Sequence, residues 1–226
     1  MLVDYAPNTT YEGDNTVLYQ QSARLITKTW KKLYLKEEGE KATGLLSYLN
    51  EVDSLLSSKS SIKSVEDALN LDNLEKGLAV RAAFRIKSTM EQMAQKDKEG
   101  VSETEKVNSL LAVDIVKMAQ NHIMYVAFKI FRNTIDTPGF IKCPNLRGHM
   151  LNLAKIYAIT ELVNVDSSAN YETGFFGLGS SGLLTEAAKK LMFIMRPHMI
   201  SLVESFQFPD SVLCSAIGNS YGDIYE

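Results

Sequence analysis

The sequence predicts an all-α protein that folds as a helical bundle. Several long stretches carry apolar residues every three to four positions, which is the period of an α-helix. Short breaks that contain Gly or Pro separate these stretches, and no pair of alternating segments or internal repeat occurs. Amphipathic helices joined by short connections bury their apolar faces against one another, so we expect a bundle.

Composition and charge limit the possible functions. The 226 residues are 45% hydrophobic and 23% charged, which is ordinary globular material for one large or two small domains. A formal net charge of −3 argues against a general nucleic-acid binder. The basic run Lys28, Lys31, Lys32 and Lys36 is explained by a solvated helix end.

Segments for secretion or membrane insertion are not expected in this sequence. No apolar stretch reaches the length that spans a bilayer, and no signal-peptide pattern is found. Cys143 and Cys214 are too few for a disulfide framework, which favours a reducing intracellular compartment. We expect both to be small buried residues.

The first helix is predicted over residues 15–34 and is followed by a less regular region. Its expected buried side comprises Val17, Leu18, Leu25, Ile26, Trp30 and Leu33. The charged stretch 36–41 is predicted to be a linker and the best candidate domain boundary. Residues 42–64 show no sustained period, so we expect irregular structure with at most a short helical piece.

Two long helices are predicted next. The first covers about residues 70–98, ends before Gly100, and has Leu74, Leu78, Ala82, Ile86, Met90 and Met93 on its apolar side. The second begins at Ser102-Glu103-Thr104-Glu105, which has the form of a capping box, and runs to about Asn133. Its expected apolar side is Leu110, Val113, Val116, Ala119, Ile123, Val126 and Ile130.

Proline residues locate the remaining helices. A helix over 144–165 opens with Pro144, and its expected apolar residues are Met150, Leu153, Ile156, Tyr157 and Leu162. Shorter helices fit 182–195 and 197–206, because Pro197 is tolerated in a first turn. Pro209 begins a last short piece.

The candidate site is a carboxylate at the start of the first helix. Gly13 allows a sharp bend after Glu12, and Asp14, Asn15 and Thr16 are all capable N-caps. Glu12 therefore precedes the helix, where free backbone N–H groups can bind an oxyanion while the carboxylate takes a proton. The alternative is that Glu12 is a solvated acidic residue, favoured only by the helix dipole.

The stretch Tyr11-Glu12-Gly13-Asp14-Asn15-Thr16-Val17-Leu18, followed by Gln21-Ser22-Ala23-Arg24, closely resembles the peroxisomal acyl-CoA oxidases of the acyl-CoA dehydrogenase superfamily. The resemblance implies that Glu12 is the general base that removes the α-proton of a fatty acyl-CoA, and that its main-chain N–H binds the thioester carbonyl. It also implies that Gly13, Asp14, Asn15 and Thr16 lie beside the cofactor FAD. It further implies O2 as the electron acceptor, a homodimer and a peroxisomal location.

The resemblance also suggests the domain organisation. Residues 1–41 would hold the catalytic-base loop and the last helix of the first C-terminal helical domain, and residues 42–226 would form the second one. Members of the family also carry an N-terminal helical domain and a β-domain, so we expect this sequence to be the C-terminal part of such an oxidase. Two alternatives stay open: an acyl-CoA dehydrogenase with a protein electron acceptor, and a catalytically inactive helical dimerisation module.

Other motifs give weaker signals. Residues 177–182 match G-x-G-x-x-G, but no buried strand precedes them, so we expect a plain loop. His122, His149 and His198 fall in three different predicted helices without metal-ligand spacing, and we expect no metal site.

Overall fold

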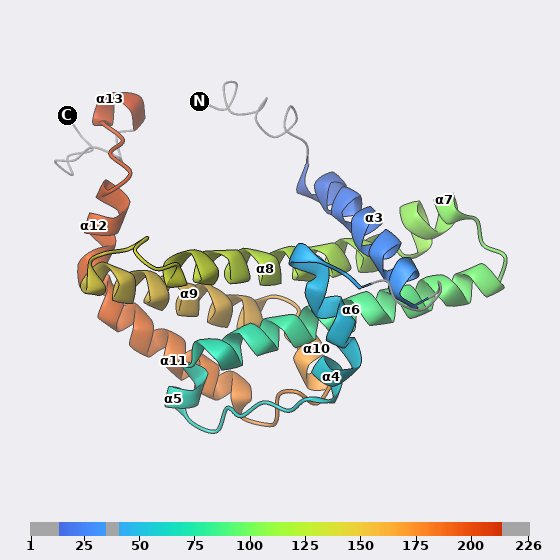
Figure 1. The fold of residues 1–226 in the computed structure, drawn as a ribbon, viewed down its shortest axis with the longest axis horizontal. Helices are drawn as coiled ribbons and strands as arrows, with labels where there is room; N and C mark the ends of the chain where they lie inside the picture. Colours follow the sequence, from blue (N-terminus) through green and yellow to red (C-terminus); the bar gives the residue numbers. More distant parts are fainter. Residues whose placement is uncertain (1–13, 35–40, 214–226) are drawn as a thin grey trace, which may run out of the picture. The chain divides into compact units, whose positions relative to one another are not determined.

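The computed structural model describes residues 14–34 and 41–213, and Figure 1 shows their arrangement. Every regular element in these ranges is helical and none is a strand, which confirms the all-α prediction. The elements are α3 Asn15–Tyr34, the 3₁₀-helix η1 Gly44–Glu51, α4 Val52–Ser57, α5 Val65–Ala68, α6 Leu71–Lys98, α7 Glu103–Glu105, the π-helix η2 Lys106–Leu110, α8 Ala112–Asp136, α9 Pro144–Asn164, α10 Ser168–Glu172, α11 Ser180–Met195, the 3₁₀-helix η3 Arg196–His198, α12 Met199–Glu204 and α13 Asp210–Leu213.

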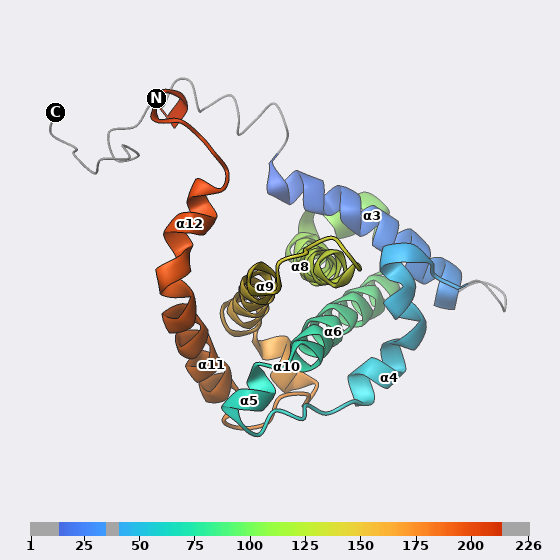
Figure 2. The same ribbon diagram turned by 60° about the vertical axis from the view of Figure 1, so that its left-hand side comes forward.

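The chain divides into two compact units after Ala188. In the first unit, α6, α8 and α9 lie side by side, and Figures 1 and 2 show α3 crossing α8 and α4 lying beside α6. Large, fully buried side chains fill the core between these helices, among them Leu78, Ile86 and Met118. The domain boundary that we predicted near residue 41 stays a prediction.

Helix α6 follows the predicted pattern throughout its length. The side chain of Asn70 caps its start by accepting hydrogen bonds from the N–H groups of Asp72 and Asn73, and Gly100, at φ +75°, follows its end. All six residues expected on its apolar side are buried. The pattern was reliable here because α6 is the central helix, and several neighbours cover its apolar side.

Helix α3 has the predicted limits, but three of the six residues that we expected to be buried are exposed. Ile26 and Trp30 are buried, whereas Val17, Leu18 and Leu25 are 51%, 46% and 58% exposed. The first two lie in the first turn of the helix, beyond the residues through which it packs. The helix therefore leaves apolar side chains exposed beside the candidate site.

The region 42–64 is more regular than predicted. Residues 44–57 are helical, first as η1 and then as α4. Leu46, Leu49 and Val52 are buried at a spacing of three, which is the repeat of a 3₁₀-helix. This spacing differs from the periods of 3.6 and 2 that indicate α-helices and strands, so the sequence pattern did not predict these helices.

The predicted helix after Ser102 is interrupted. Ser102 Oγ accepts a hydrogen bond from the N–H of Glu105, as expected for an N-cap. A π-helix then follows, and Leu111, at φ −118° and ψ 13°, separates it from α8.

The side of this helix that faces the core differs from the apolar side that we predicted. Leu110, Val113 and Ile130 are exposed, whereas Ala119 and Val126 are buried as predicted. The buried side instead includes Asn121 and His122, because both find polar partners inside the core: Asn121 Nδ2 lies 2.9 Å from Asp166 Oδ2, and His122 Nδ1 lies 2.9 Å from Tyr48 Oη.

Helix α9 opens with Pro144 as predicted, and a buried arginine satisfies its C-terminal end. Among its five expected apolar residues only Leu162 is buried, because Ala154 and Ala158 bring the helix close to its neighbours instead. The guanidinium of Arg81, which is fully buried, donates to the carbonyl oxygens of Glu161 and Val165. Carbonyls at a helix C-terminus lack partners within the helix and attract cations, so Arg81 ties α6 to the end of α9.

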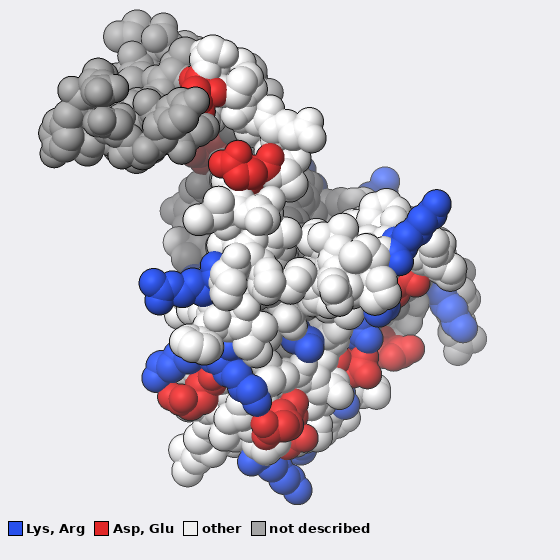
Figure 3. Space-filling view, turned by 90° about the vertical axis from the view of Figure 1, so that its left-hand side faces the viewer, with Lys and Arg blue, Asp and Glu red and all other residues white. Residues whose placement is uncertain are grey.

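The second unit, from Lys189 onward, contains the end of α11, then η3, α12 and α13, with Pro197 inside η3. Its described surface is strongly apolar, and Figure 3 shows a face with few charged atoms there. Its most exposed apolar side chains are Phe193, Ile200, Val203, Phe206, Phe208 and Val212.

Two further expectations can be checked on the described chain. Cys143 is exposed, so its prediction as a buried residue was wrong, and the reason is its position at the N-cap of α9. Cys214 lies outside the described residues. None of the helices searched, which are those of residues 14–34 and 41–213, is long and apolar enough to cross a membrane.

Candidate functional site

The described part of the candidate site begins at Asp14, which caps α3. The N–H of Thr16 donates to Asp14 Oδ1 at 2.7 Å, and the N–H of Leu18 donates to the carbonyl oxygen of Asp14 at 3.0 Å. The pKa of Asp14 is lowered, first by the hydrogen bond from the Thr16 side chain and then by that from its backbone. Asp14 is therefore ionised at neutral pH and fixes the start of the helix where the sequence predicts it.

Glu12 and Gly13, the predicted general base and its neighbour, lie outside the described residues. Asp14, Asn15 and Thr16 are all exposed, and so are Val17 and Leu18 after them. This end of α3 therefore offers polar and apolar side chains together on an accessible surface.

These exposed residues fit the neutral part of a flavin better than its phosphates. Two of the three side chains, those of Asn15 and Thr16, are uncharged hydrogen-bonding groups, and such groups suit a ring edge or a ribityl hydroxyl. The ionised Asp14 would repel a pyrophosphate placed against it. The residues present are thus compatible with FAD, provided that its phosphates lie elsewhere.

The three histidines do not come together as a metal site. His122 is buried against Tyr48, and burial lowers the pKa of His122 to about 4. Among the described residues, no group of three or more His, Cys, Asp or Glu side chains could hold a metal ion. The G-x-G-x-x-G match at 177–182 is only partly the loop that we predicted, because residues 177–179 form the turn before α11 and residues 180–182 are its first residues.

The structure also shows two polar features that the sequence patterns do not predict. One is the set of buried or half-buried ionic side chains that joins α6 to the α9–α10 connection, with Arg81, Arg85, Glu161 and Asp166. The spacing of Arg81 and Arg85 by four positions within the otherwise apolar stretch 77–86 is the signal that could have indicated it. The other is a groove beside α3 that is lined by Arg24, Lys28 and Lys31. The sequence pattern assigns Lys28 and Lys31 to a solvated helix end.

Comparisons with known proteins agree with this fold. Residues 70–226 match the family model described as acyl-CoA oxidase. The peroxisomal acyl-coenzyme A oxidase 1 of Phascolarctos cinereus is 26% identical over 227 residues, which cover 99% of this chain and 33% of the relative. A putative peroxisomal acyl-coenzyme A oxidase 1.2 of Arabidopsis thaliana is 27% identical over 225 residues, which cover 98% of this chain and 32% of the relative.

Solved structures show the same relationship. Acyl-CoA oxidase 1 of Arabidopsis thaliana superposes with a TM-score of 0.85 at 26% identity, over 98% of this chain and 32% of that one. An acyl-CoA oxidase from Lycopersicon esculentum (tomato) gives 0.86 at 26% identity, over the same shares of the two chains. Acyl-CoA oxidase-1 of Caenorhabditis elegans, solved in complex with FAD and ATP, shares the fold with a TM-score of 0.80 at 19% identity, over 96% of this chain and 31% of that one.

The chain spans about a third of the length of the curated relatives it matches. The family model, in contrast, covers more than two thirds of this chain, and the matched segment includes α6, α8 and α9, which build the core. The chain therefore belongs to the acyl-CoA oxidase family.

Proposed function

We propose that this chain is the C-terminal part of an FAD-dependent acyl-CoA oxidase that acts on fatty acyl-CoA in peroxisomal β-oxidation. The observation that carries the proposal is the family match together with Tyr11-Glu12-Gly13 directly before the start of α3. The peroxisomal location rests on the names of the relatives, and the homodimer on resemblance to the family.

Glu12 is the proposed general base. Its carboxylate takes the proton from the α-carbon of the acyl group, and its main-chain N–H donates to the thioester carbonyl, where negative charge develops. FAD, when bound, would supply the acceptor for the hydride that leaves the β-carbon, and O2 would take up the two electrons together with two protons to give H2O2. The organic product is the trans-2-enoyl-CoA.

The surroundings of Glu12 have to favour proton removal at neutral pH. An apolar acyl chain that displaces water from the carboxylate disfavours its charged form and raises its pKa. Val17 and Leu18 are exposed apolar side chains at this end of α3 and are suited to contact that acyl chain. Gly13, Asp14, Asn15 and Thr16 are the residues proposed to lie beside the flavin.

The experiment uses the native gene product that contains residues 1–226. The purified protein is incubated with palmitoyl-CoA, and enoyl-CoA and H2O2 are measured in parallel. We expect equal amounts of both products. We also expect Glu12→Gln to lower turnover by at least about 10³-fold while bound flavin is retained, because a carboxamide cannot take the proton.

The outcomes separate the remaining alternatives. Enoyl-CoA without peroxide would indicate a dehydrogenase that uses a protein acceptor. Absence of both products, together with absence of bound flavin, would indicate a helical interaction module. A Glu12→Gln variant with unchanged turnover would exclude Glu12 as the base.

A further inference from the structure

A groove that no part of the proposed reaction uses runs along α3. It lies between α3 on one side and α7, η2 and the start of α8 on the other, within the first unit. Its volume is about 370 Å³, which is in the range of small-molecule sites, about 300–1,000 Å³. We call it the α3 groove, after the helix that supplies most of its lining.

The bottom of the α3 groove is aliphatic. Ala23, Met93 and Ile115 are nearly fully buried, and Val107 of the π-helix completes this lining. The described residues that line the groove include no aromatic side chain, and aromatic stacking is a common way in which proteins hold a nucleobase. The lining therefore suits a flexible aliphatic chain better than a planar ring.

One edge of the groove is cationic. Arg24, Lys28 and Lys31 follow one another at spacings of four and three, so they share a helix face, and like charges at this spacing repel. None of the three forms an ion pair with a carboxylate of residues 14–34 or 41–213; Arg24 donates to Gln21 Oε1 at 3.1 Å. A bound anion would remove this repulsion.

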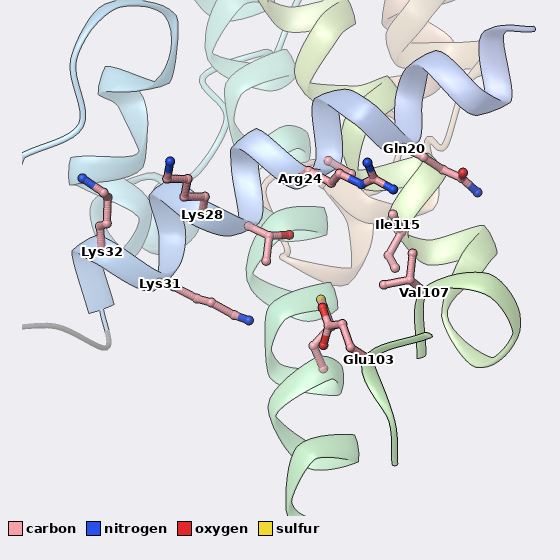
Figure 4. A pocket seen from close by; sticks show the side chains of 11 residues that line it. Gln20, Arg24, Lys28, Lys31, Lys32, Glu103, Val107 and Ile115 are labelled. Atoms are coloured by element: carbon pink, nitrogen blue, oxygen red, sulfur yellow. The ribbon is translucent and has the colours of Figure 1, made fainter. Parts of the chain in front are cut away.

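The carboxylate of Glu103 also lines the groove, and its charge is partly compensated by Lys106. Lys106 Nζ lies 2.7 Å from Glu103 Oε2 and also pairs with Asp97. Figure 4 shows Lys31 extending toward the side that carries Glu103, and Arg24 lying near Gln20 at the other end of the groove. Lys28 and Lys32 point away from Glu103 in this view. Arg24 and Lys31 are thus the cations best placed for a ligand.

We propose that the α3 groove binds a fatty acid anion. The aliphatic chain lies on Ala23, Met93, Val107 and Ile115, Arg24 holds the carboxylate, and Lys31 adds positive charge at the other end of the groove. A guanidinium can donate two parallel hydrogen bonds to a carboxylate, so Arg24 provides most of the selectivity for the head group. The site requires neither Glu12 nor FAD and so does not depend on the proposed function.

The test is isothermal titration calorimetry of the native gene product that contains residues 1–226, with decanoate and with decan-1-ol, which has the same tail and no charge. We expect one saturable site for decanoate and at least tenfold weaker binding of decan-1-ol. The double variant Arg24→Gln/Lys31→Gln should bind decanoate at least tenfold more weakly. The variant Arg24→Lys keeps the charge but cannot donate two parallel hydrogen bonds, so it should bind decanoate more weakly than the unmodified chain and more tightly than the double variant.

Controls locate the binding. Lys98→Gln/Lys142→Gln removes the same charge at two exposed lysines outside the groove and should leave affinity unchanged. Phe193→Ser/Ile200→Ser, in the apolar second unit, should do the same. The proposal fails if decanoate does not bind saturably, if decan-1-ol binds equally well, if the second-unit variant abolishes binding, or if inorganic pyrophosphate binds and decanoate does not.

Discussion

Arg85 holds Asp166 through two hydrogen bonds, one from Nε to Oδ2 and one from Nη2 to Oδ1, each 2.5 Å long. Asp166 lies in the connection from α9 to α10 and has φ +48°, a left-handed conformation that Asp tolerates better than most residues. Asn121 of α8 donates to the same carboxylate. One side chain thus joins α6 and α8 to the turn that ends α9.

Loss of this pair should destabilise the first unit. Arg85→Ala leaves the carboxylate of Asp166, whose side chain is only 8% exposed, without its cation. We expect the free energy of unfolding to fall by about 3 kcal/mol, the lower end of the range for a broken buried pair, because Arg85 keeps some contact with solvent. Urea denaturation measures the change.

The matched control is Lys87→Ala in the same helix. Lys87 pairs with Asp53 at 2.9 Å, but both side chains are well exposed. Exposed pairs contribute little, so the loss should stay below about 1 kcal/mol. An Arg85→Ala variant as stable as Lys87→Ala would show that the pair with Asp166 does not hold the turn.

His122 should make the stability depend on pH. Its pKa is about 4 in the folded chain because burial disfavours the charged ring, whereas the unfolded value is near 6.5. The unfolded chain therefore binds the proton first as the pH falls, and the folded state loses stability between about pH 6.5 and pH 4. From this single group, we expect about 2 kcal/mol less stability at pH 5 than at pH 7.5.

The variant His122→Gln isolates this effect. Glutamine keeps a polar group near Tyr48 Oη but does not titrate, so the difference between variant and unmodified chain should narrow as the pH falls from 7.5 to 5. Urea denaturation at both pH values checks it. A pH-independent difference would show that His122 titrates normally in the folded chain.

Asp14 should stabilise α3 as its N-cap, independently of its charge. Asp14→Ala removes the acceptor for the N–H of Thr16 and should lower the melting temperature, whereas Asp14→Asn should retain most of the stability because Asn is an equally good N-cap. The buried side chain of Trp30, in the same helix, provides the fluorescence signal. Equal melting temperatures for Asp14→Ala and the unmodified chain would contradict this role.

Gly77 should tolerate only the smallest change. A Cβ at this position would lie 3.2 Å and 3.3 Å from the two methyl carbons of Leu162 and 3.5 Å from Phe175 Cε1. Gly77→Ala gains helix propensity and loses packing, so we expect a net change within about 1 kcal/mol. Gly77→Val overpacks the contact and should cost about 2 kcal/mol, measurable by thermal denaturation. A harmless valine would show that Leu162 has room to move.

How much the sequence reveals depends on what each side chain contacts. The limits of α3 and α6 are set by local features, Asp14 and Asn70 as caps and Gly100 as a terminator, so these could be predicted. The core side of α8 could not, because it depends on Tyr48 and Asp166, partners distant in sequence that make His122 and Asn121 acceptable inside.

The candidate site shows the same division. The capping geometry of Asp14 follows from its neighbours, and the role of Glu12 comes from resemblance and stays a prediction. The α3 groove could not be predicted from the sequence of α3. Its lining also includes Met93 and Ile115, which come from other helices and lie opposite the cations of α3.

The apolar surface of the second unit has a practical consequence for the choice of assay. Dyes such as anilinonaphthalene sulfonate become fluorescent on exposed apolar surface and are widely used to detect molten globules. Side chains such as Ile200 and Phe206 are already more than 70% exposed in the folded chain. Bright dye fluorescence from this protein will therefore report its native surface, and loss of packing must be followed by near-ultraviolet circular dichroism instead.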